Sequence, residues 1–533
     1  EGLFMPGGRI WYGAGRAKSQ LLNCFVVPAS DSREGWGKVL SDTIIVSGTG
    51  GGVGINLSPI RPRGSEIKGT GGRATGSVSL MQINVKLKEE ELTNANVSVV
   101  LPTGYDASQF ASDVQSGHPI PLRFGGVDRE DRGVGADVLW QTIVDNAWTS
   151  GEPGVLNAAL ANEHNNIWYH KPLISTNPCG EIWLEEYGCC DLGALVLPRF
   201  VSAGGSTDYD LVDRVVRLGV RFLDNVLTVN DYPLPEIETN CLNVRRIGLG
   251  VMGLHTYLLA KGMKYSSAEA LNEVDDLLSF IKNTAYDEST TLAAEKGAFP
   301  VYSDALLESG FAQKLKRGIR NKIRTHGLRN CAILTIAPTG TTGMVHGVTT
   351  GIEPVMAARY KRRYYSDIAA TGRADEIVTD WHYSAYPDII EDAYTLEPRH
   401  HFDMQVTVQE HIDNAVSKTI NLPEDYPKEE LSDLWLEYLP SIKGSTFYRW
   451  GSRADQPIEP LPAEVTGDAE GREEVRNRKD RHGTTEEGGG WEDDGGNGKY
   501  VEKRGVGGMG DSSGGYDTLL PFDPSCPDGS CDI

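Results

Sequence analysis

The stretch at residues 332–342 reads AILTIAPTGTT and decides the fold class. Its first five residues are apolar or β-branched and a proline follows closely, which is typical of a buried strand that ends at a turn. The turn offers backbone N–H groups and three hydroxyls, and it favours a phosphate where a helix begins. An ordinary turn with a helix cap is the alternative interpretation of these residues taken alone.

Strand and helix patterns alternate on both sides of this stretch. Residues 96–101 predict a further strand, and residues 210–226 and 267–295 predict amphipathic helices. A capping box formed by Ser266 and Glu269 opens the second helix. Alternation of this kind favours an α/β architecture for the main body of the chain.

The composition narrows the class of protein. The chain has 533 residues, of which 39% are hydrophobic, and it contains no apolar run long enough to cross a membrane. The 51 lysines and arginines face 74 aspartates and glutamates, and the net charge of −23 argues against nucleic acid as a partner. The first residues, Glu1, Gly2 and Leu3, show neither an initiator methionine nor a secretion signal, so we expect the cut end of a longer protein.

Cysteine usage points to a cytoplasmic protein with a few reactive thiols. Eight cysteines are few for this length, which argues against a secreted disulfide scaffold. No two of them are spaced as CxxC, which argues against a zinc ribbon, and we expect no metal site. The eight residues are Cys24, Cys179, Cys189, Cys190, Cys241, Cys331, Cys526 and Cys531.

The composition changes after about Arg453. Residues 453–517 are rich in glycine and charged side chains and cannot bury enough apolar surface to fold, so we expect a flexible acidic linker. Residues 518–533 carry Cys526 and Cys531 in a Cys-x4-Cys spacing. We interpret this tail as a tethered dithiol that carries electrons to a buried site, and two incidental thiols are the alternative.

The pentapeptide at residues 177–181, NPCGE, places a thiol between an amide and a carboxylate. On an extended segment, side chains two residues apart share a face. Asn177, Cys179 and Glu181 would then offer a hydrogen-bonding amide, a thiol and a base to one small substrate, which suits neighbouring carbons of a polyhydroxylated ring. A turn with a buried structural cysteine is the alternative.

Two glycine motifs have weaker implications. Residues 248–253 match G-x-G-x-x-G, but no clear buried strand precedes them and no strand ending in an acid follows about 20 residues on, so a nicotinamide-dinucleotide site is disfavoured. Residues 48–54 lack the Lys-Ser/Thr of a P-loop. We expect these glycines to let the backbone approach a ligand or another segment closely.

Taken together, these segments resemble the large catalytic subunit of ribonucleotide reductase, most closely the adenosylcobalamin-dependent class II enzymes. The resemblance runs from about residue 6 to residue 452 and returns at the extreme C-terminus. The matching pieces are residues 6–10, 23–26, 48–56, 69–73, 177–181, 245–250, 337–342, 351–354, 419–423 and 443–453.

This resemblance implies a fold and a reaction. The fold is a ten-stranded α/β barrel over residues 1–452, made of two five-stranded parallel halves, with a central finger loop that carries Cys179. A radical from adenosylcobalamin would take the hydrogen atom of Cys179, and the thiyl radical would abstract the 3′-hydrogen of the ribose. Glu181 would act as base on the 3′-hydroxyl, Asn177 would hold the sugar, and the 2′-hydroxyl would leave as water.

The resemblance also implies the source of the two electrons. Cys24 and Cys190 would supply them, although a slip of one residue to Cys189 stays open. Cys526 and Cys531 would then reduce the resulting disulfide by thiol exchange, and thioredoxin or glutaredoxin would recharge that pair. Cys189, Cys241 and Cys331 are otherwise expected to be packing residues.

Binding residues follow from the same resemblance. A nucleoside triphosphate effector would contact Asp31, Arg61 and Lys68, for which solvated surface charge is the alternative, and a homodimer is expected. The expected substrate-binding residues are Asn23, Gly52, Asn177, Pro178, Cys179, Gly180, Glu181, Pro338, Thr339, Gly340, Thr341 and Thr342.

The absence of a tyrosine after Tyr448 indicates which radical source this chain uses. Class I large subunits relay a radical from a separate radical-generating subunit through two adjacent tyrosines, and here Arg449 follows Tyr448. The tail also shows no glycyl-radical motif of class III, so adenosylcobalamin remains. The alternatives are a class I-type subunit and a catalytically impaired nucleotide-binding remnant. The remnant is motivated by an N-terminal region and several dozen residues near positions 84–85 that the chain lacks relative to the family.

Overall fold

The computed structural model describes residues 2–67, 71–82, 98–101, 105–124, 127–365, 373–452 and 458–461. All of them belong to one of the two compact units into which the chain divides. The expectations for Lys68, Cys526 and Cys531, and those for nearly all of the linker and tail, lie outside the described residues.

The first sheet places the N-terminus beside the middle of the chain. Strand β1 (Phe4–Pro6) runs antiparallel to β10 (Leu192–Val196), which runs parallel to β11 (Gly248–Met252). Single parallel bridges continue the order from Leu249 to Leu334 and from Ile336 to Val416. Residues 332–336 therefore lie beside β11 in extended form, although they form bridges rather than the full strand that we predicted.

The second sheet contains two parallel pairs that meet antiparallel. Strand β14 (Thr419–Leu422) is parallel to β15 (Gly444–Arg449), and β4 (Ser98–Leu101) is parallel to β7 (Gly154–Asn157). Strands β15 and β7 join the two pairs in antiparallel register. The predicted strand at residues 96–101 is thus confirmed for the four residues of β4.

Smaller strand pairs complete the architecture. Strands β2 (Cys24–Pro28) and β3 (Gly52–Asn56) are parallel, with Cys24 opposite Gly52. Strands β8 (Ser175–Thr176) and β9 (Trp183–Leu184) form a hairpin. The remaining strands are β5 (Pro119–Phe124) with β6 (Val127–Gly135), and β12 (Arg359–Tyr365) with β13 (Arg373–Thr379) and β16 (Ile458–Pro460).

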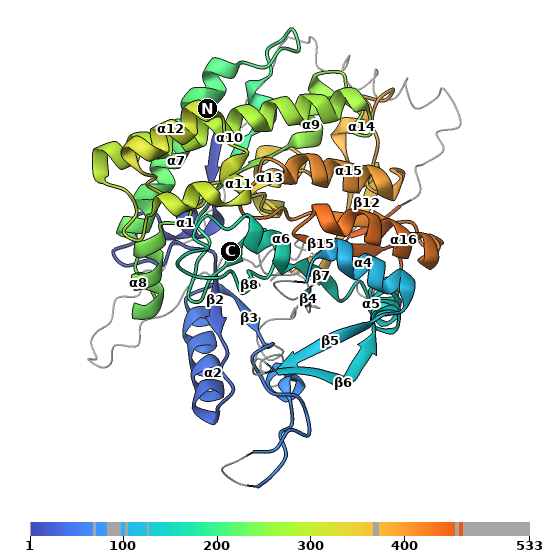
Figure 1. Ribbon diagram of the computed structural model, residues 1–533. Helices are drawn as coiled ribbons and strands as arrows, with labels where there is room; N and C mark the ends of the chain where they lie inside the picture. Colours follow the sequence, from blue (N-terminus) through green and yellow to red (C-terminus); the bar gives the residue numbers. More distant parts are fainter. Residues whose placement is uncertain are drawn as a thin grey trace, which may run out of the picture. The chain divides into compact units, whose positions relative to one another are not determined.

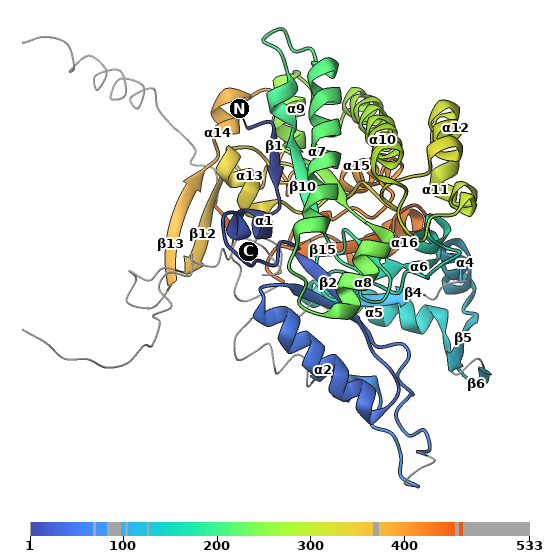
Figure 2. The same cartoon turned by 90° about the vertical axis from the view of Figure 1, so that its left-hand side faces the viewer.

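Strand β16 corrects the predicted linker boundary. It pairs antiparallel with β12, so residues 458–460 are part of a sheet rather than of a flexible linker. The long β12–β13 pair stands at one edge of the unit in Figure 2. Most of the sequence between β1 and β15 thus folds as a mixed α/β structure, as the alternation predicted.

Helices surround these strands (Figure 1). The two long helices α7 and α10 lie side by side, and α7 packs on β10 and β11. The α-helices are α1 (Gly8–Gly13), α2 (Arg33–Gly48), α4 (Ala107–Ser116), α5 (Ala136–Ser150), α6 (Ala158–Glu163), α7 (Tyr209–Val229), α8 (Pro235–Val244), α9 (Leu254–Ala260), α10 (Ala268–Lys296), α11 (Gly310–Gln313), α12 (Arg317–His326), α13 (Gly340–His346), α14 (Trp381–Ala385), α15 (Pro398–Gln409) and α16 (Lys428–Tyr438). Short 3-10 helices cover Leu197–Phe200, Asp304–Glu308 and Leu439–Ser441.

Both predicted amphipathic helices are confirmed as α7 and α10, but the capping box is wrong by one residue. Ser267, not Ser266, caps α10 and accepts a hydrogen bond from the Ala270 N–H. Ser266 instead donates its hydroxyl to Glu391 at 2.7 Å. Ser266 thus bonds to a carboxylate that is distant in the sequence, instead of capping the helix together with Glu269.

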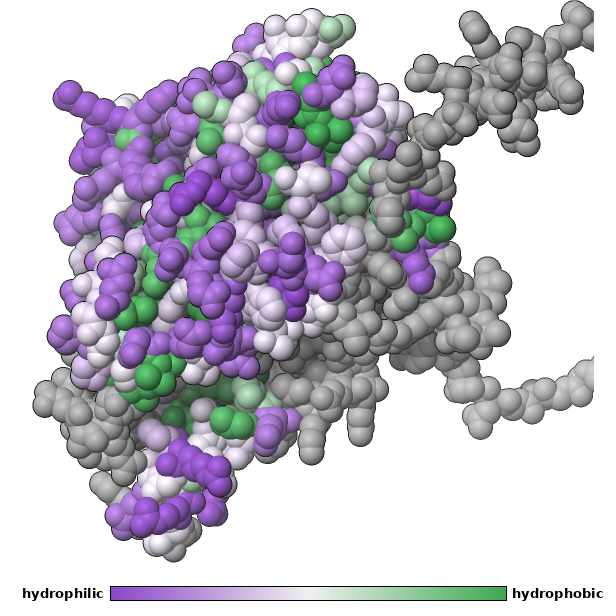
Figure 3. All heavy atoms as spheres, turned by 90° about the vertical axis from the view of Figure 1, so that its right-hand side faces the viewer, coloured by the Kyte–Doolittle hydropathy of each residue, from purple (hydrophilic) through white to green (hydrophobic). Residues whose placement is uncertain are grey.

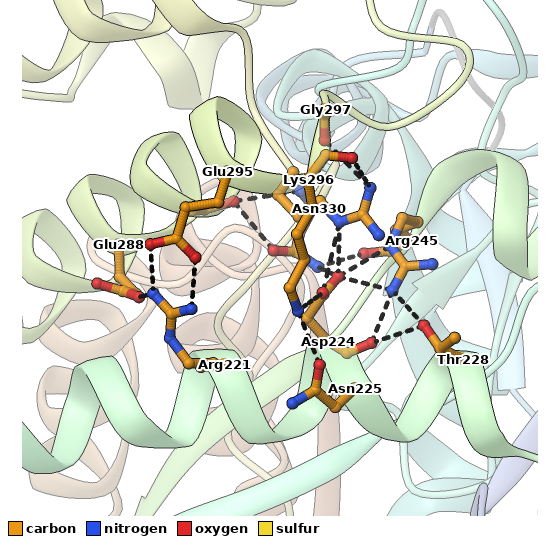
Figure 4. Close-up of polar contacts among 12 residues, drawn as sticks. Arg221, Asp224, Asn225, Thr228, Arg245, Glu288, Glu295, Lys296, Gly297 and Asn330 are labelled. Atoms are coloured by element: carbon orange, nitrogen blue, oxygen red, sulfur yellow. Dashed lines mark hydrogen bonds and ion pairs between the residues drawn. The ribbon is translucent and has the colours of Figure 1, made fainter.

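A buried ion network ties α7 to α10 and to the turn before β11 (Figure 4). The Asp224 carboxylate, which is fully buried, accepts from Arg245 Nε at 2.8 Å and from Lys296 Nζ at 3.1 Å. Arg329 Nε donates to it at 3.1 Å and Asn330 Nδ2 at 3.3 Å. Burial alone would raise the pKa of Asp224, but Arg245 and the other cations hold that pKa below its ordinary value. The carboxylate is therefore charged and fixes the end of α8 over the sheet.

Hydrophilic residues dominate the described surface, and apolar residues form the core. Figure 3 shows hydrophilic residues over most of the described surface on one face, with small separate hydrophobic spots. Among the described residues, no helix combines the length and the apolar character needed to cross a membrane. The largest buried cluster joins β2, β3, α7, α8 and α10.

Candidate active site

The NPCGE segment forms a tight loop at the tip of the β8–β9 hairpin. The Asn177 N–H donates to the Ile182 carbonyl at 3.1 Å, and Asn177 Oδ1 accepts from the Ile182 N–H at the same distance. The Gly180 N–H donates back to the Asn177 carbonyl, with Gly180 at a φ of +77°. Our prediction of an extended segment was wrong, because these local bonds close a turn.

The three polar side chains of this turn differ in how deeply they are buried. Asn177 and Glu181 are buried, whereas Cys179 lies half-buried at the tip. The sulfur of Cys179 is in a disulfide in this structure. Chemistry at this residue therefore requires its reduction to a thiol first.

The base of the loop is latched to two distant segments. The Glu181 carbonyl accepts from the Thr335 hydroxyl at 2.6 Å and from the Ala415 N–H at 2.8 Å. Thr335 lies beside β11 and Ala415 beside Ile336, so the latch joins the loop to the first sheet. Glu181 is therefore held by its backbone, independently of its carboxyl group.

A cavity brings several predicted site residues together. Its wall combines the N-terminal strand, the residue before β2, the finger loop, β10 and the phosphate turn. The lining residues are Met5, Pro6, Gly7, Asn23, Glu181, Leu192, Gly193, Ala194, Gly250, Ala337, Pro338, Thr339 and Thr342. Five of the predicted substrate residues thus meet here, from segments more than 100 residues apart in the chain.

The other predicted substrate residues lie off this wall. Asn177, Pro178, Cys179, Gly180, Gly340 and Thr341 do not line the cavity, and neither does Gly52. Gly52 instead packs against the finger loop, since a Cβ there would lie 3.2 Å from Pro178 Cγ. Gly52 thus serves close packing, as expected for the glycine run at residues 48–54.

Two buried amide atoms near the cavity have no hydrogen-bond partner within the described part of the chain. They are the acceptor Asn23 Oδ1 and the donor Asn177 Nδ2. Buried polar atoms are rarely left unsatisfied in native proteins. The pair fits a ligand that carries both hydroxyl donors and hydroxyl acceptors, as a sugar does.

Cys24 and Cys190 form a thiol pair beside this cavity. The Cys190 N–H donates to the Cys24 carbonyl at 2.9 Å. Both thiols are buried and free. Burial, the Cys24 thiol and the Glu181 charge together raise the pKa of Cys190 well above its ordinary value. The protonated Cys190 thiol therefore lies within electrostatic reach of Glu181.

Cys189 occupies a different environment from Cys190. Its sulfur lies 2.9 Å from the Cys241 sulfur on α8. The register that would join Cys189 to Cys24 is therefore not the one in this structure.

The turn at residues 338–342, where we predicted a phosphate site, leads into a helix. Helix α13 starts at Gly340, and Thr339 before it adopts a φ of +50° and a ψ of +36°. The Thr339 hydroxyl oxygen accepts from the Gly351 N–H at 2.7 Å, which stabilises this unusual conformation. Left-handed backbone at a residue with a side chain is typical of functional sites.

The G-x-G-x-x-G motif has a packing role. Gly248 and Gly250 lie inside strand β11, and a Cβ on Gly250 would stand 2.3 Å from the Thr335 carbonyl oxygen. A dinucleotide-binding motif places its glycines in the turn after the strand. The nicotinamide hypothesis is therefore not supported.

The two described effector candidates pair with each other. Arg61 Nε donates to Asp31 Oδ2 at 2.7 Å, and both side chains are about one quarter exposed. At the position of the missing tyrosine, the Arg449 guanidinium stacks on the Trp148 ring at 3.8 Å and donates to the Trp148 carbonyl. Arg449 therefore packs as a structural residue.

Sequence reasoning missed part of the cavity wall and the latch. Met5, Leu192, Gly193 and Ala194 carry no reactive group, so no chemical signal marked them. Gly7 is required by close packing, because a Cβ there would lie 2.8 Å from Asn23 Oδ1. Within the described ranges, no three of the His, Cys, Asp and Glu side chains are arranged to hold a metal ion.

Comparisons with known proteins identify the family of this chain. A family model described as the barrel domain of ribonucleotide reductase matches residues 22–120 and 126–438. The vitamin B12-dependent ribonucleoside-diphosphate reductase of Mycobacterium tuberculosis (strain CDC 1551 / Oshkosh) is 30% identical over 524 residues, which cover 88% of this chain and 73% of that protein.

Two further relatives extend the comparison. The enzyme of the same name from Thermoplasma acidophilum is 29% identical over 87% of this chain and 65% of its own length. The ribonucleoside-diphosphate reductase subunit alpha of Chlamydia pneumoniae is 24% identical over 66% of this chain and 42% of its own length.

Proposed function

This chain belongs to the ribonucleotide reductase family, and we propose that it reduces ribonucleotides to 2′-deoxyribonucleotides for DNA synthesis. The observation that carries the proposal is the meeting of Asn23, Glu181 and the turn at Pro338–Thr342 around one cavity, with a buried dithiol at Cys24 and Cys190 beside it. The substrate is a ribonucleoside diphosphate or triphosphate, and the names of the relatives favour the diphosphate.

Three residues of the finger loop act on the ribose. Cys179, once reduced and converted to a thiyl radical, takes the 3′-hydrogen of the sugar. Glu181 removes the proton of the 3′-hydroxyl, so that the 2′-hydroxyl leaves as water after protonation. Asn177 Nδ2 is an unpaired buried donor, which supports its role in holding a sugar hydroxyl.

Cys24 and Cys190 supply the electrons. Reduction at the 2′-carbon consumes two electrons and two protons, and two thiols yield these when they join as a disulfide. The 2.9 Å backbone bond from the Cys190 N–H to the Cys24 carbonyl supports this pairing. Burial raises the pKa of Cys190, so that its thiol keeps a proton that the reaction consumes.

The residues of the loop tip fit adenosylcobalamin. Among the described residues, no atom lies within 4 Å of a Cβ built on Gly180, which leaves space on that side of the loop next to Cys179. When bound, the cofactor supplies a carbon-centred radical that can remove the hydrogen atom of a thiol. Cys179 and Gly180 would face it, and Arg449 in place of a second tyrosine removes the alternative relay.

The proposal also includes the barrel, the tail cysteines, the effector site, the homodimer and the cellular compartment. The parallel strand pairs and their antiparallel junction at β7 and β15 support closure into a ten-stranded barrel of two five-stranded halves over residues 1–452. Cys526 and Cys531 on the tail return electrons from thioredoxin or glutaredoxin. An effector at Asp31, Arg61 and Lys68 sets substrate choice in a homodimer, and a reaction that consumes thiols belongs in the reducing cytoplasm.

An anaerobic assay tests the proposal. The purified chain is incubated with adenosylcobalamin, dithiothreitol and a ribonucleoside diphosphate, with a triphosphate in a parallel reaction. We expect deoxyribonucleotide from the parent chain and none from the Cys179→Ser variant, although both bind the nucleotide. Nucleotide binding by the parent chain without any product would overturn the proposal and favour the impaired remnant.

A further inference from the structure

A second pair of thiols lies outside the proposed catalytic set. The sulfurs of Cys189 and Cys241 are 2.9 Å apart, and both side chains are at most 2% exposed. A disulfide has a sulfur–sulfur distance of about 2.05 Å, so closure needs an approach of only about 0.9 Å. Both are free thiols in this structure.

The two thiol pairs share one short segment. Cys189 bridges to Phe25 in antiparallel register, so the segment is extended here. Neighbouring side chains of an extended segment point to opposite faces. Cys190 therefore meets Cys24 on one face, while Cys189 meets Cys241 of α8 on the other.

The surroundings of Cys189 keep its thiol protonated at neutral pH. The hydrogen bond to Cys241, followed by burial, raises the pKa of Cys189 well above its ordinary value, and the charges of Asp191 and Glu185 act in the same direction. A protonated thiol reacts slowly with oxidants. We therefore expect Cys189 to react only under sustained oxidation.

A surface cavity lies close to the buried Cys241. Tyr187 and Asn240 line this cavity. Asn240 precedes Cys241 in α8, and the Cys241 thiol lies 3.8 Å from the Tyr187 carbonyl oxygen to which it points. Tyr187 and Asn240 therefore stand between a peroxide molecule in this cavity and the Cys241 sulfur.

We propose that Cys189 and Cys241 are a second redox pair, which closes to a disulfide under a peroxide independently of Cys24 and Cys190. The sulfur of one cysteine attacks a peroxide oxygen, the O–O bond breaks, and a sulfenic acid and one water form. The other thiol attacks that sulfur and expels the second water. Two thiols and one hydrogen peroxide thus give one disulfide and two waters.

Peptide mapping after oxidation tests this proposal. Cleavage with trypsin and a glutamate-specific protease yields residues 187–199 with Cys189 and Cys190, residues 239–245 with Cys241, and residues 19–33 with Cys24. We expect hydrogen peroxide to link 187–199 to 239–245 in the folded chain, and dithiothreitol to release the link. Mass spectrometry measures the linked fraction.

Paired variants assign the sulfurs. Cys190→Ala should keep the link from 187–199 to 239–245 and lose the link to 19–33. Cys189→Ala should do the reverse. Cys331→Ala removes another buried thiol that lies apart from both pairs and should change neither link.

Two results would overturn the proposal. One is a link from 187–199 to 239–245 that persists in Cys189→Ala. The other is the absence of this link in folded Cys190→Ala at a peroxide concentration that already oxidises the buried Cys331 to its sulfinic acid. Neither result depends on catalytic activity, so failure here is distinguishable from failure of the proposed function.

Discussion

The Cys190 N–H donates to the Cys24 carbonyl at 2.9 Å, so the backbone holds the two cysteines side by side. The backbone bond does not depend on sulfur. Either thiol can therefore be replaced without separating the two segments. This makes the pair suitable for substitution experiments in which fold and chemistry are distinguished.

Cys190→Ser should abolish sustained turnover while leaving nucleotide binding intact, because no disulfide can form when one sulfur is absent. The measurement is deoxyribonucleotide production with adenosylcobalamin and excess dithiothreitol, alongside nucleotide affinity. The neighbouring substitution Cys189→Ser is the matched control and should retain turnover. Equal loss of turnover in both variants would contradict the assignment of Cys190.

Glu181→Gln should lower kcat by about 10²–10⁴-fold, the range in which a positioned general base contributes to catalysis. The amide has the same shape but cannot take the proton of the 3′-hydroxyl. Because the Glu181 backbone is held by Thr335 and Ala415, the loop should keep its place. Single-turnover rates measure the effect, and an unchanged rate would remove Glu181 as the base.

Thr335→Val should lower kcat about fivefold, because one hydrogen bond to the Glu181 carbonyl is lost and such a bond contributes about 1 kcal/mol. KM should change little, since Thr335 does not line the cavity. In a Glu181→Gln background the same change should have a smaller effect, because the two groups act as a unit.

Thr290→Val serves as the control for this latch. Thr290 is also buried and its hydroxyl donates to a backbone carbonyl within α10, at 2.7 Å from Asp287 O. This variant should lose a similar amount of stability without a change in kcat. A parallel loss of kcat in both variants would mean that Thr335 acts through general stability alone.

The sequence predicted those parts of the fold whose signals are local. Helices α7 and α10 repeat apolar residues at helical spacing, and their bounds are confirmed within a few residues. The NPCGE loop was predicted as extended because its residues were considered only in pairs. The bonds between Asn177 and Ile182 close the turn, and nothing in residue spacing alone marks them.

Long-range contacts explain most of what the sequence left open. The latch joins Glu181 to Thr335, 154 residues away, and hydroxyl side chains give no sign of such a partner. Whether Cys189 or Cys190 faces Cys24 depends on strand register, since a slip of one residue exchanges the two faces. The resemblance indicated Cys190, but only the bridge between Phe25 and Cys189 shows the register in space.

Acid should destabilise this protein below about pH 6.5 through its buried neutral histidines. Burial lowers the pKa of His164 to about 2 and that of His255 to about 3, from an ordinary value of 6.5. The unfolded chain therefore binds more protons than the folded chain below pH 6.5, so stability is full above that pH and is lost as pH falls. Each such histidine should cost about 2 kcal/mol at pH 5 relative to pH 7.

Thermal unfolding between pH 7 and pH 5 measures this effect. His164→Phe removes a titrating ring that packs against Phe311 and should flatten the decline in midpoint temperature. The exposed His326, replaced by Gln, should leave the decline unchanged. A decline of the same slope in His164→Phe would contradict this origin of the acid sensitivity.

Gly54→Ala should disable the site by displacing the finger loop. A Cβ on Gly54 would lie 2.0 Å from the Thr176 carbonyl oxygen, and this atom is backbone that cannot rotate away. We expect β3 and β8 to separate, with a loss of stability of about 1–3 kcal/mol and a large fall in kcat. Unfolding midpoints and single-turnover rates measure the two effects.

Gly37→Ala is the matched control for this close approach. Gly37 lies in α2, is exposed and has no atom within 4 Å of its Cβ position, so alanine should raise helix stability by up to about 1 kcal/mol. The same substitution should therefore have opposite signs at the two glycines. If Gly54→Ala were as stable and as active as the parent chain, the finger loop could not depend on the contact with β3, and the glycine run would need another explanation.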